Sequence, residues 1–587
     1  MSVLVDVALP GPWWTLLTYE AAALPVSGTR LLVPVGNGTR VGFAVGPSLS
    51  PPMMELRSVL DVLDVENPLG QELWELLLWV GKTFLCGSGL ALMAACPAEL
   101  LGGAPLPSLS VAVPMKSAFQ EEHCFSPMDG ERMSFYRRRA EGGGRSLFLF
   151  PEARTARHFF SSLPASVRAE AVLWPSSGGK KLWDVWQKVR AGNFRIVVAP
   201  PGGVFAPFAP EQILVDEEAS PAYIAQRPPR FSARSIAGRR AVCLGAALVL
   251  GGRMPSAKTF LRSRPPCSTL PDRREIVFAD IRRSLMGEER GVDGAIPLAV
   301  SLLDRTRQNL SAGRHVLWIL DRRGEAAEVF CQECGHSIRC GRCGGTMRSE
   351  ASGRSLRGVR CGLRAELPSR CPACGGELWM GRRPGIEALA AMAGRLVRGY
   401  PVLLHDGKKM EVGGPSIIVG TRGSLSLCDR LDVGLAAWLD LDAELRRPEY
   451  GARFQVFSMI WESCWRGRAE GVGRTVLVQG RRFGSEWRTF LTRGWDHFWR
   501  RELALRAELD LPPSGLLIQV DLPKNEDRGA MIRMLEDAGL FVMDPGDAGM
   551  PLWLTPASID EVSRALAPRF AIGRSRSRFP VVTVWAE

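Results

Sequence analysis

The sequence concentrates half of its cysteines in one short segment, and this cluster constrains the fold more than any other feature. Seven of the 14 cysteines lie between residues 331 and 374. Six of them form three Cys-x-x-Cys pairs, each followed by glycine: CQECG, CGRCG and CPACG. Such a pair places two thiolates on one tetrahedral zinc, and two pairs complete a structural site. The glycine permits the positive φ with which the chain turns beneath the metal.

The rest of the chain indicates a reducing compartment. Its start, MSVLVDVALPGPWW, lacks the basic region and cleavage site of an export signal. The most apolar stretch, Leu73 to Cys96, is interrupted by Glu75 and Lys82, so we expect no membrane span. We therefore expect a cytoplasmic protein whose clustered thiols bind metal rather than form disulfides. The composition, 46% hydrophobic and 23% charged, is globular, and the net charge of +13 favours a polyanionic partner.

The number of ligands in the cysteine segment allows more than one solution. Cys361 precedes Gly362 like the second half of a fourth pair, but its partner position is Gly358. Seven thiolates complete one four-cysteine site and leave three, to which His336 or water could add a ligand. The segment is also rich in arginines, which fit phosphate contacts or a solvated face. These arginines are Arg339, Arg342, Arg348, Arg354, Arg357, Arg360 and Arg364.

The hydrophobic pattern predicts an α/β multidomain protein. Short β-like runs and a helical stretch over 69–84 make residues 1–100 a β-rich domain, followed by a linker over 101–124. Buried strands such as SLFLFP and QILVDEE then alternate with helical segments, as parallel sheets do. We predict one α/β lobe over 125–296 and a second over 297–505, with the cysteine segment 331–375 inserted into it. A small α+β domain occupies 506–587.

Longer stretches resemble one known family along nearly the whole chain. DRRGEAAEVFCQECGHSIRCGRCGG, CPACGGELWMGRRPGIEAL, VDVALPGPWWTLLTY, GGVFAPFAPEQILVDEEASPAY and RRELALRAELDLPP occur in family order. They resemble the primosomal replication restart helicases of the PriA family. The resemblance implies two RecA-like helicase lobes, a zinc-ribbon insertion in the second lobe and an N-terminal domain that captures the 3′ end of a nascent DNA strand. The winged helix that the family carries after its N-terminal domain has no room in 101–124.

The resemblance also assigns site residues. Cys331, Cys334, Cys371 and Cys374 would bind one zinc, and Cys340, Cys343 and Cys361 an incomplete second one. In the pocket for the terminal nucleotide, Leu17 and Thr18 replace an aromatic–aspartate pair, while Gly36 and Arg57 persist. We expect Thr18, Gly36 and Arg57 to contact DNA, and threonine to bind a hydroxyl more weakly than a carboxylate does.

The motifs of an ATP-driven motor are degraded. A phosphate-binding loop G-x-x-x-x-G-K-[ST] occurs nowhere in the sequence. At its place the chain reads SPMDGERMSFY, so that Arg132 and Met133 stand where lysine and threonine belong. Methionine offers no oxygen to Mg²⁺, and arginine is a poor substitute for a compact ammonium.

The other motor motifs depart in the same direction. Motif II keeps Asp216, Glu217 and Glu218 but has Ala219 in place of histidine, and both hydroxyls of the G-S-A-T motif are lost in GAAL. In the arginine-finger motif, WESCWRGR, Arg468 remains while tryptophans replace glutamine and the first arginine. We interpret Arg132, Asp216, Glu217 and Arg468 as vestigial and expect no ATP or Mg²⁺ cofactor.

The sequence thus supports three hypotheses. In the first, the chain binds stalled or forked DNA and promotes primosome assembly without its own motor, with the replicative helicase loader, other primosome proteins and single-stranded DNA-binding protein as partners. In the second, it is an active ATP-dependent 3′–5′ helicase with an unconventional nucleotide site. In the third, it is a zinc-ribbon interaction scaffold without fork specificity. We favour the first because several motor motifs are lost independently.

Overall fold

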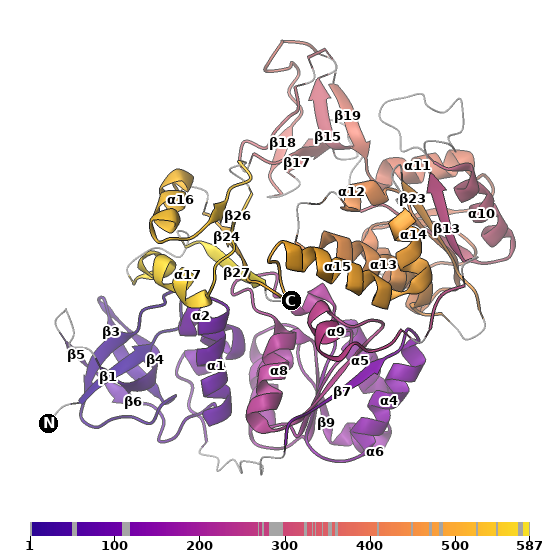
Figure 1. The fold of residues 1–587 in the computed structure, drawn as a ribbon. Helices are drawn as coiled ribbons and strands as arrows, with labels where there is room; N and C mark the ends of the chain where they lie inside the picture. Colours follow the sequence, from indigo (N-terminus) through magenta and orange to yellow (C-terminus); the bar gives the residue numbers. More distant parts are fainter. Residues whose placement is uncertain are drawn as a thin grey trace. The chain divides into compact units, whose positions relative to one another are not determined.

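A computed structural model gives the fold, and its described residues contain five β-sheets with helices between their strands (Figure 1). The structure describes all residues except 1–2, 50–55, 108–117, 268, 273–274, 281–297, 322–325, 332, 335, 343, 350–354, 359–361, 378, 408–409, 446, 448–449, 469–471, 481–484, 524–525, 547–549, 573–578 and 586–587. The chain divides into two compact units. One combines Met1–Ser126, Gly130–Pro265 and Glu502–Glu587, and the other combines Pro127–Asp129 and Pro266–Arg501.

The N-terminal domain is a six-stranded sheet followed by three helices. The strand order is β5-β2-β1-β4-β3-β6, with β5 parallel to β2 and the other pairs antiparallel, and the predicted β-like runs correspond to β1, β3 and β4. These strands are β1 (Val3–Ala8), β2 (Leu17–Ala21), β3 (Arg30–Val35), β4 (Gly38–Pro47), β5 (Arg57–Ser58) and β6 (Asp61–Val62). The helices are α1 (Gln71–Thr83), α2 (Gly87–Ala95) and α3 (Ala98–Leu101). Helix α1 confirms the helix expected over 69–84.

The first α/β lobe is a parallel sheet covered on both faces. Its strand order is β7-β12-β11-β8-β10-β9. The strands are β7 (Gln120–Phe125), β8 (Ser146–Leu149), β9 (Ala171–Leu173), β10 (Ile196–Ala199), β11 (Gln212–Val215) and β12 (Ala247–Gly252). The helices are α4 (Asp129–Glu141), α5 (Ala153–Ser162), α6 (Ala165–Ala169), α7 (Lys180–Arg190), η1 (Pro201–Phe205), η2 (Pro221–Tyr223), α8 (Ala233–Leu244) and α9 (Ala257–Ser263).

The continuous apolar runs of this lobe reflect burial on both sides. Along β8, Leu147 and Leu149 pack in the core that contains α8, whereas Phe148 and the following Phe150 pack in the core that contains α4 and α5. Successive side chains of a strand point to opposite faces, so a strand between two helical layers needs apolar residues at every position. The predicted parallel sheet is confirmed on this point.

Buried contacts join the N-terminal domain to the first lobe within the same unit. Arg240 of α8 is fully buried and binds both carboxylate oxygens of Glu72 in α1, at 2.9 and 3.0 Å. The same guanidinium donates to the carbonyls of Val204 and Phe208. A buried arginine is stable only when its donors and its charge are satisfied in this way.

The second lobe repeats the parallel architecture. Its strand order is β13-β23-β22-β14-β21-β20. The strands are β13 (Ile276–Asp280), β14 (His315–Ile319), β20 (Val402–His405), β21 (Ile417–Gly420), β22 (Val433–Trp438) and β23 (Thr475–Gly480). The helices are α10 (Val300–Ser311), α11 (Ile386–Leu396), η3 (Arg422–Asp429), α12 (Leu441–Leu445), α13 (Ala452–Trp465), α14 (Ser485–Arg493) and α15 (Trp495–Glu508).

The cysteine segment lies in a separate antiparallel sheet between β14 and α11. Its order is β18-β17-β16-β15-β19, with strands β15 (Ala326–Cys331), β16 (Met347–Ser349), β17 (Ser355–Gly358), β18 (Arg364–Glu366) and β19 (Trp379–Pro384). The C-terminal domain has the antiparallel order β25-β26-β24-β27. Its elements are β24 (Leu517–Asp521), α16 (Arg528–Asp537), β25 (Val542–Met543), β26 (Leu552–Leu554), α17 (Ile559–Leu566), η4 (Ala567–Phe570) and β27 (Val581–Trp585).

Several predicted boundaries need correction. Strand β7 begins at Gln120, inside the predicted linker, because it completes the edge of the first lobe's sheet. Strand β13 pairs with β23, so the second lobe begins before 297. The sheet of the cysteine segment extends beyond 331–375 on both sides, since β15 pairs with β19. Within the predicted first lobe, α8 ends at Leu244 and is capped by Gly245, whose φ of 66° is left-handed, and β12 starts two residues after the cap.

Candidate functional sites

The acidic residues of motif II lie at the carboxyl end of β11 and bind arginines of their own lobe. Asp216 is 1% exposed and accepts hydrogen bonds from Arg132 Nε at 3.2 Å and from Tyr136 Oη at 2.8 Å. Arg132 Nη2 donates to Glu217 Oε1 at 2.7 Å, and Nη1 donates to the carbonyl of Ser126. The structure thus brings together three of the four residues that the sequence indicated as vestigial catalytic groups.

Two further arginines complete this cluster. Arg253 Nη1 donates to Glu217 Oε1, and its backbone N–H donates to Glu217 Oε2 at 3.2 Å. Glu218 is buried between Arg234, which donates through Nε, and the backbone N–H of Ser256 at 2.6 Å. Sequence reasoning missed Arg234 and Arg253, because their partners are 16 and 36 residues away and no local pattern marks the pairing.

The electrostatics of the cluster are those of a closed ion-pair network. Burial raises the pKa of the Asp216 carboxyl, and the adjacent Arg132 guanidinium opposes this rise. Burial also raises the pKa of Tyr136 well above its usual value, so its hydroxyl remains a donor. Two oxygen atoms that could otherwise ligate a divalent cation, Asp216 Oδ1 and Glu217 Oε1, accept hydrogen bonds from Arg132, which is itself 1% exposed.

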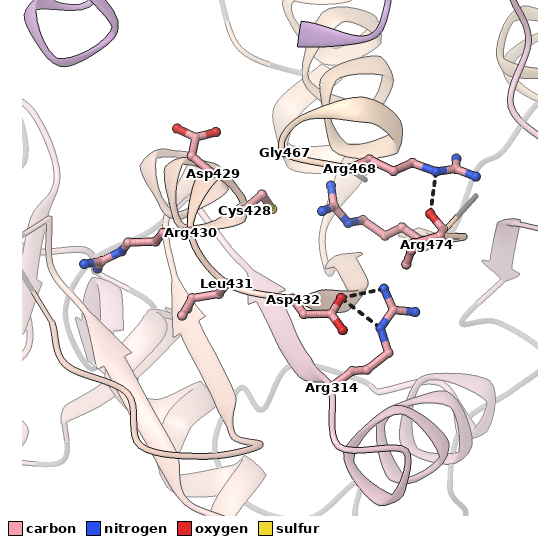
Figure 2. A pocket seen from close by; sticks show the side chains of 10 residues that line it. Arg314, Cys428, Asp429, Arg430, Leu431, Asp432, Gly467, Arg468 and Arg474 are labelled. Carbon is pink, nitrogen blue, oxygen red and sulfur yellow. Dashed lines mark hydrogen bonds and ion pairs between the residues drawn. The ribbon is translucent and has the colours of Figure 1, made fainter. Parts of the chain in front are cut away.

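In the second lobe, the residues of the arginine-finger motif bind and pack against other residues of the same lobe. Arg468 follows α13 and binds both carboxylate oxygens of Glu275 at 3.0 Å. Its Nε donates to the carbonyl of Val472 (Figure 2). Trp461 is fully buried and Trp465 is 5% exposed, and both pack in the aromatic core of α13. The tryptophans therefore fill the core of the lobe.

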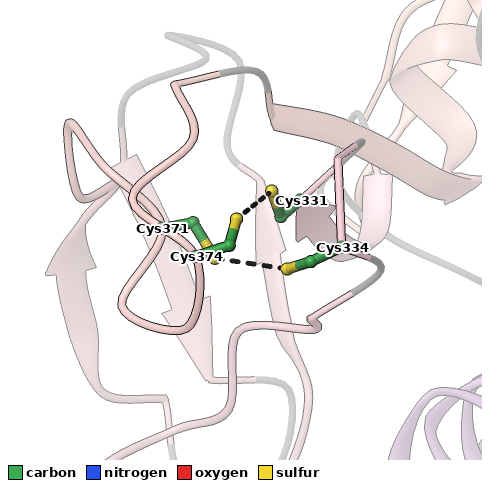
Figure 3. A group of neighbouring side chains, drawn as sticks. All are labelled: Cys331, Cys334, Cys371 and Cys374. Carbon is green, nitrogen blue, oxygen red and sulfur yellow. Dashed lines mark hydrogen bonds between the residues drawn. The ribbon is translucent and has the colours of Figure 1, made fainter.

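Four of the seven clustered cysteines converge on one point (Figure 3). The Sγ atoms of Cys331, Cys334, Cys371 and Cys374 all lie within 4.8 Å of one another. Cys331 and Cys374 are 3.6 Å apart, and Cys334 and Cys371 are 3.7 Å apart. A tetrahedral site with Zn–S bonds of about 2.3 Å requires S···S separations of about 3.8 Å. The four thiols therefore fit a zinc ion in geometry and in ligand type.

The backbone around these cysteines supports thiolate ligands. The N–H of Cys371 donates to the carbonyl of Gly376, and Gly375, at φ 78°, donates back to the carbonyl of Cys371. Burial raises the pKa of the Cys371 thiol, but the N–H groups of Ala373 and Cys374 and the thiols of Cys334 and Cys374 lower it to about 7. The same thiol–thiol hydrogen bonds raise the pKa of Cys334 and of Cys374, so the four sulfur atoms share their protons, and a bound metal ion would stabilise all four as thiolates.

Two of the three cysteines predicted for the second zinc site, Cys343 and Cys361, lie outside the described residues. Cys340 is buried at a turn in which its N–H binds the carbonyl of Gly345 and its carbonyl binds the N–H of Gly344. Gly358 makes the equivalent bonds to Leu363 and Gly362. The hydrogen bonds of Gly358 therefore match those of Cys340, although glycine stands where the first cysteine of a fourth pair would be. His336 is not part of the four-cysteine group.

The residues expected in the N-terminal pocket are only partly brought together. Arg57 Nη1 donates to the carbonyl of Gly36 at 2.7 Å, and Arg57 pairs with Tyr19 across β5 and β2. Thr18 is the neighbour of Tyr19 in β2 and therefore points to the other face of the sheet. There its hydroxyl donates to Asp6 of β1 at 2.7 Å, a carboxylate that sequence reasoning missed.

Other predicted features have the following positions. Within the described residues, Arg339, Arg342 and Arg364 of the cysteine module are exposed. Arg354 and Arg360 lie outside the described residues. Between α3 and β7, the described residues form neither helix nor strand. Among the described residues, helices long and apolar enough to cross a membrane are absent.

Comparisons with known proteins agree along the chain. Residues 6–97 match the model of the 3′ DNA-binding domain of PriA. The replication restart protein PriA of Treponema pallidum is 23% identical over 99% of this chain and 96% of its own length. The Bacillus subtilis protein of the same name is 23% identical over 65% of this chain and 50% of its length. The probable replication restart protein PriA of Mycobacterium leprae is 28% identical over 68% of this chain and 62% of its own length.

The first relatives are longer than the part that aligns. The chain spans about half the length of the curated relatives from Bacillus subtilis and Thermotoga maritima, 50% and 54% respectively. Among solved structures, S. cerevisiae Dbp5 bound to RNA and ADP BeF3 aligns with 75% of this chain and 97% of that chain. The TM-score of this alignment is 0.33 at 9% sequence identity, so the fold is described from the strand order of this chain alone.

Proposed function

We propose that this chain, which belongs to the PriA family of replication restart proteins, binds branched DNA and promotes replication restart without hydrolysing ATP. The match of residues 6–97 to a 3′ DNA-binding domain supports the DNA-binding part. The net charge of +13 supports it independently, because a basic protein attracts the phosphate backbone.

The observation that carries the second part is the pairing of Arg132 with Asp216 and Glu217. A phosphoryl-transfer site needs carboxylates to hold Mg²⁺ and a lysine to reach the phosphates. Here the residue at the lysine position turns back onto the carboxylates instead. Binding Mg²⁺ would require displacing a buried guanidinium, and removing one partner of a buried ion pair costs about 3–5 kcal/mol.

Zinc, in this proposal, is held by Cys331, Cys334, Cys371 and Cys374 and supplies a structural cross-link. Exposed arginines of the same module, Arg339 and Arg342, are suited to phosphates of the bound DNA. We propose the cytoplasm as the location. Primosome proteins, the helicase loader and single-stranded DNA-binding protein are the proposed protein partners, as the resemblance implies.

Binding of matched forks tests the proposal. A fork whose leading-strand arm ends in a 3′-hydroxyl at the branch should bind more tightly than the same fork with a 3′-phosphate. Arg57→Ala should reduce this preference, whereas Arg398→Ala, which removes an exposed arginine of the second lobe, should leave it unchanged. Equal binding of the two forks by the wild-type chain would favour a scaffold without fork specificity.

A further inference from the structure

Three adjacent central strands of the second lobe each begin directly after a charged residue. Arg314 precedes β14, Asp432 precedes β22 and Arg474 precedes β23. The end of η3 and the turn after α13 join them around a cavity of about 410 Å³ (Figure 2). Its lining includes the arginines Arg314, Arg430, Arg468 and Arg474. The cavity is thus formed by the amino ends of strands and lies wholly within one unit.

A glycine permits the close approach that shapes this cavity. Gly467 has a φ of 61°, and a Cβ atom there would lie 1.9 Å from the carbonyl oxygen of Cys428. Any other residue would push the turn after α13 away from the end of η3. The two segments that carry Arg468 and Arg430 are therefore held together by backbone packing.

The charges around the cavity are not balanced. Asp432 is bound by Arg314 at 2.9 and 3.0 Å, and Asp429 is bound by Arg466 at 2.8 and 2.9 Å. Arg468 is bound to Glu275. Within the part of the chain that the structure describes, no carboxylate pairs with the two remaining arginines, Arg430 and Arg474.

Arg474 is the more unusual of the two, because it is buried without an opposite charge. The residue is 3% exposed, and its guanidinium donates to the backbone carbonyls of Val433, Ser463 and Arg466 at 2.7–3.2 Å. Figure 2 shows its side chain extending toward Cys428. These bonds use Nε and Nη1, and the N–H groups of Nη2 bind no other described residue. A buried cation needs an anion nearby to offset the loss of hydration.

We propose that this cavity binds a phosphate group through Arg474 and Arg430. Guanidinium groups bind phosphate in a planar, two-pronged geometry, and the cavity has the size of small-ligand sites. Arg474 supplies a fixed donor, since its other donors are held by carbonyls. The exposed Arg430, whose side chain extends away from Arg474 in Figure 2, must turn toward Arg474 to reach the same ligand. The phosphate belongs to a free nucleotide or to the 5′ end of a nucleic-acid strand. The proposal is independent of the fork-binding role, because it involves no residue of the N-terminal domain or the first lobe.

Binding of inorganic pyrophosphate to the full-length chain, measured by titration calorimetry without divalent metal, tests the proposal. Pyrophosphate should bind saturably, and Arg430→Ala should weaken the binding about tenfold, the value of one charge-assisted hydrogen bond. Arg430 makes no side-chain bond with the described residues, so this variant should fold normally. Arg398→Ala, which removes the same charge outside the cavity, should change the affinity by less than about twofold, as expected of a screened distant charge.

Competition identifies the source of the phosphate. ADP or a 5′-phosphorylated oligonucleotide should displace pyrophosphate, and the matching 5′-hydroxyl oligonucleotide should not. Displacement by ADP alone assigns the site to free nucleotides, and displacement by the phosphorylated strand alone assigns it to nucleic-acid ends. Absence of saturable pyrophosphate binding, equal weakening by Arg430→Ala and Arg398→Ala, or displacement by neither competitor would overturn the proposal.

Discussion

The four-cysteine cluster and the acidic cluster of the first lobe both gather side chains that bind metal ions, yet only the cysteines keep their ligand atoms for a metal. Their Sγ atoms face one another at 3.6 and 3.7 Å, the spacing of a zinc site. The carboxylates of Asp216 and Glu217 are instead bound to arginines. Retained residue types therefore do not imply a retained site, because the function depends on what occupies their ligand atoms.

The largest expected effect is loss of the zinc site. Cys371→Ser removes one of four thiolates, and structural zinc contributes on the order of 10 kcal/mol to the folding of small zinc modules. We expect this variant to lose one zinc per chain by mass spectrometry and to lose hydrogen-exchange protection in β15 and β19. Cys243→Ser, which changes a cysteine of α8 outside the cluster, should keep both. Unchanged zinc content in Cys371→Ser would contradict the assignment of the ligands.

Removing the internal arginine of the acidic cluster should have the next largest effect. Arg132→Ala leaves Asp216 buried without its main ion pair, and we expect a loss of about 3–5 kcal/mol in the free energy of unfolding. Manganese should then raise the melting temperature of the variant more than that of the wild type, because the freed carboxylates offer oxygen ligands. Arg138→Ala, an exposed residue of the same helix, serves as the control. Equal stability of the two variants would show that the buried pairing is unimportant.

A substitution at Gly358 tests whether the cysteine module can hold a second zinc ion. Gly358→Cys adds the missing thiolate at a position whose backbone hydrogen bonds already match those of Cys340. We expect the variant to hold more zinc per chain than the wild type after dialysis against a weak chelator. If its zinc content matches that of the wild type, the residues around 340 and 358 do not form a second site.

The smallest expected effect concerns the 3′ end. Arg57→Ala removes one exposed guanidinium, and we expect its preference for a 3′-hydroxyl fork to fall by about 1 kcal/mol, or roughly fivefold in relative affinity. Asp6→Asn should weaken the same preference if the carboxylate beside Thr18 contacts the terminal hydroxyl. A competition assay between the two forks measures both. If both variants keep the wild-type preference for the 3′-hydroxyl fork, other residues contact the 3′ end.

The sequence predicted the strands best where burial is uniform. Runs such as 147–150 and 213–215 are apolar at every position, because helices cover both faces of the sheet. Strand β13 was assigned to the wrong lobe, since its partner β23 lies about 200 residues away and only pairing defines the sheet. The local spacing within each pair identified the clustered cysteines as metal ligands, whereas the choice of the four that share one site came from the family resemblance.

The sites were predicted less completely where the partners are distant in sequence. The sequence showed that Arg132 does not fit a phosphate loop, but it could not show that Arg132 binds Asp216, 84 residues away. Thr18 and Arg57 were placed in one pocket, although the alternation of side chains in β2 puts Thr18 and Tyr19 on opposite faces. The cavity proposed to bind phosphate gave no sequence signal, because its arginines come from three separate stretches of the chain.

The central claim is that the nucleotide site of the first lobe is filled by an internal arginine, and ATP hydrolysis in the presence of forked DNA tests it most directly. The account predicts no hydrolysis above background for the wild-type chain, with or without a saturating fork. Fork-stimulated hydrolysis that disappears in Asp216→Ala would show that the acidic cluster still works in a motor, and would contradict the account.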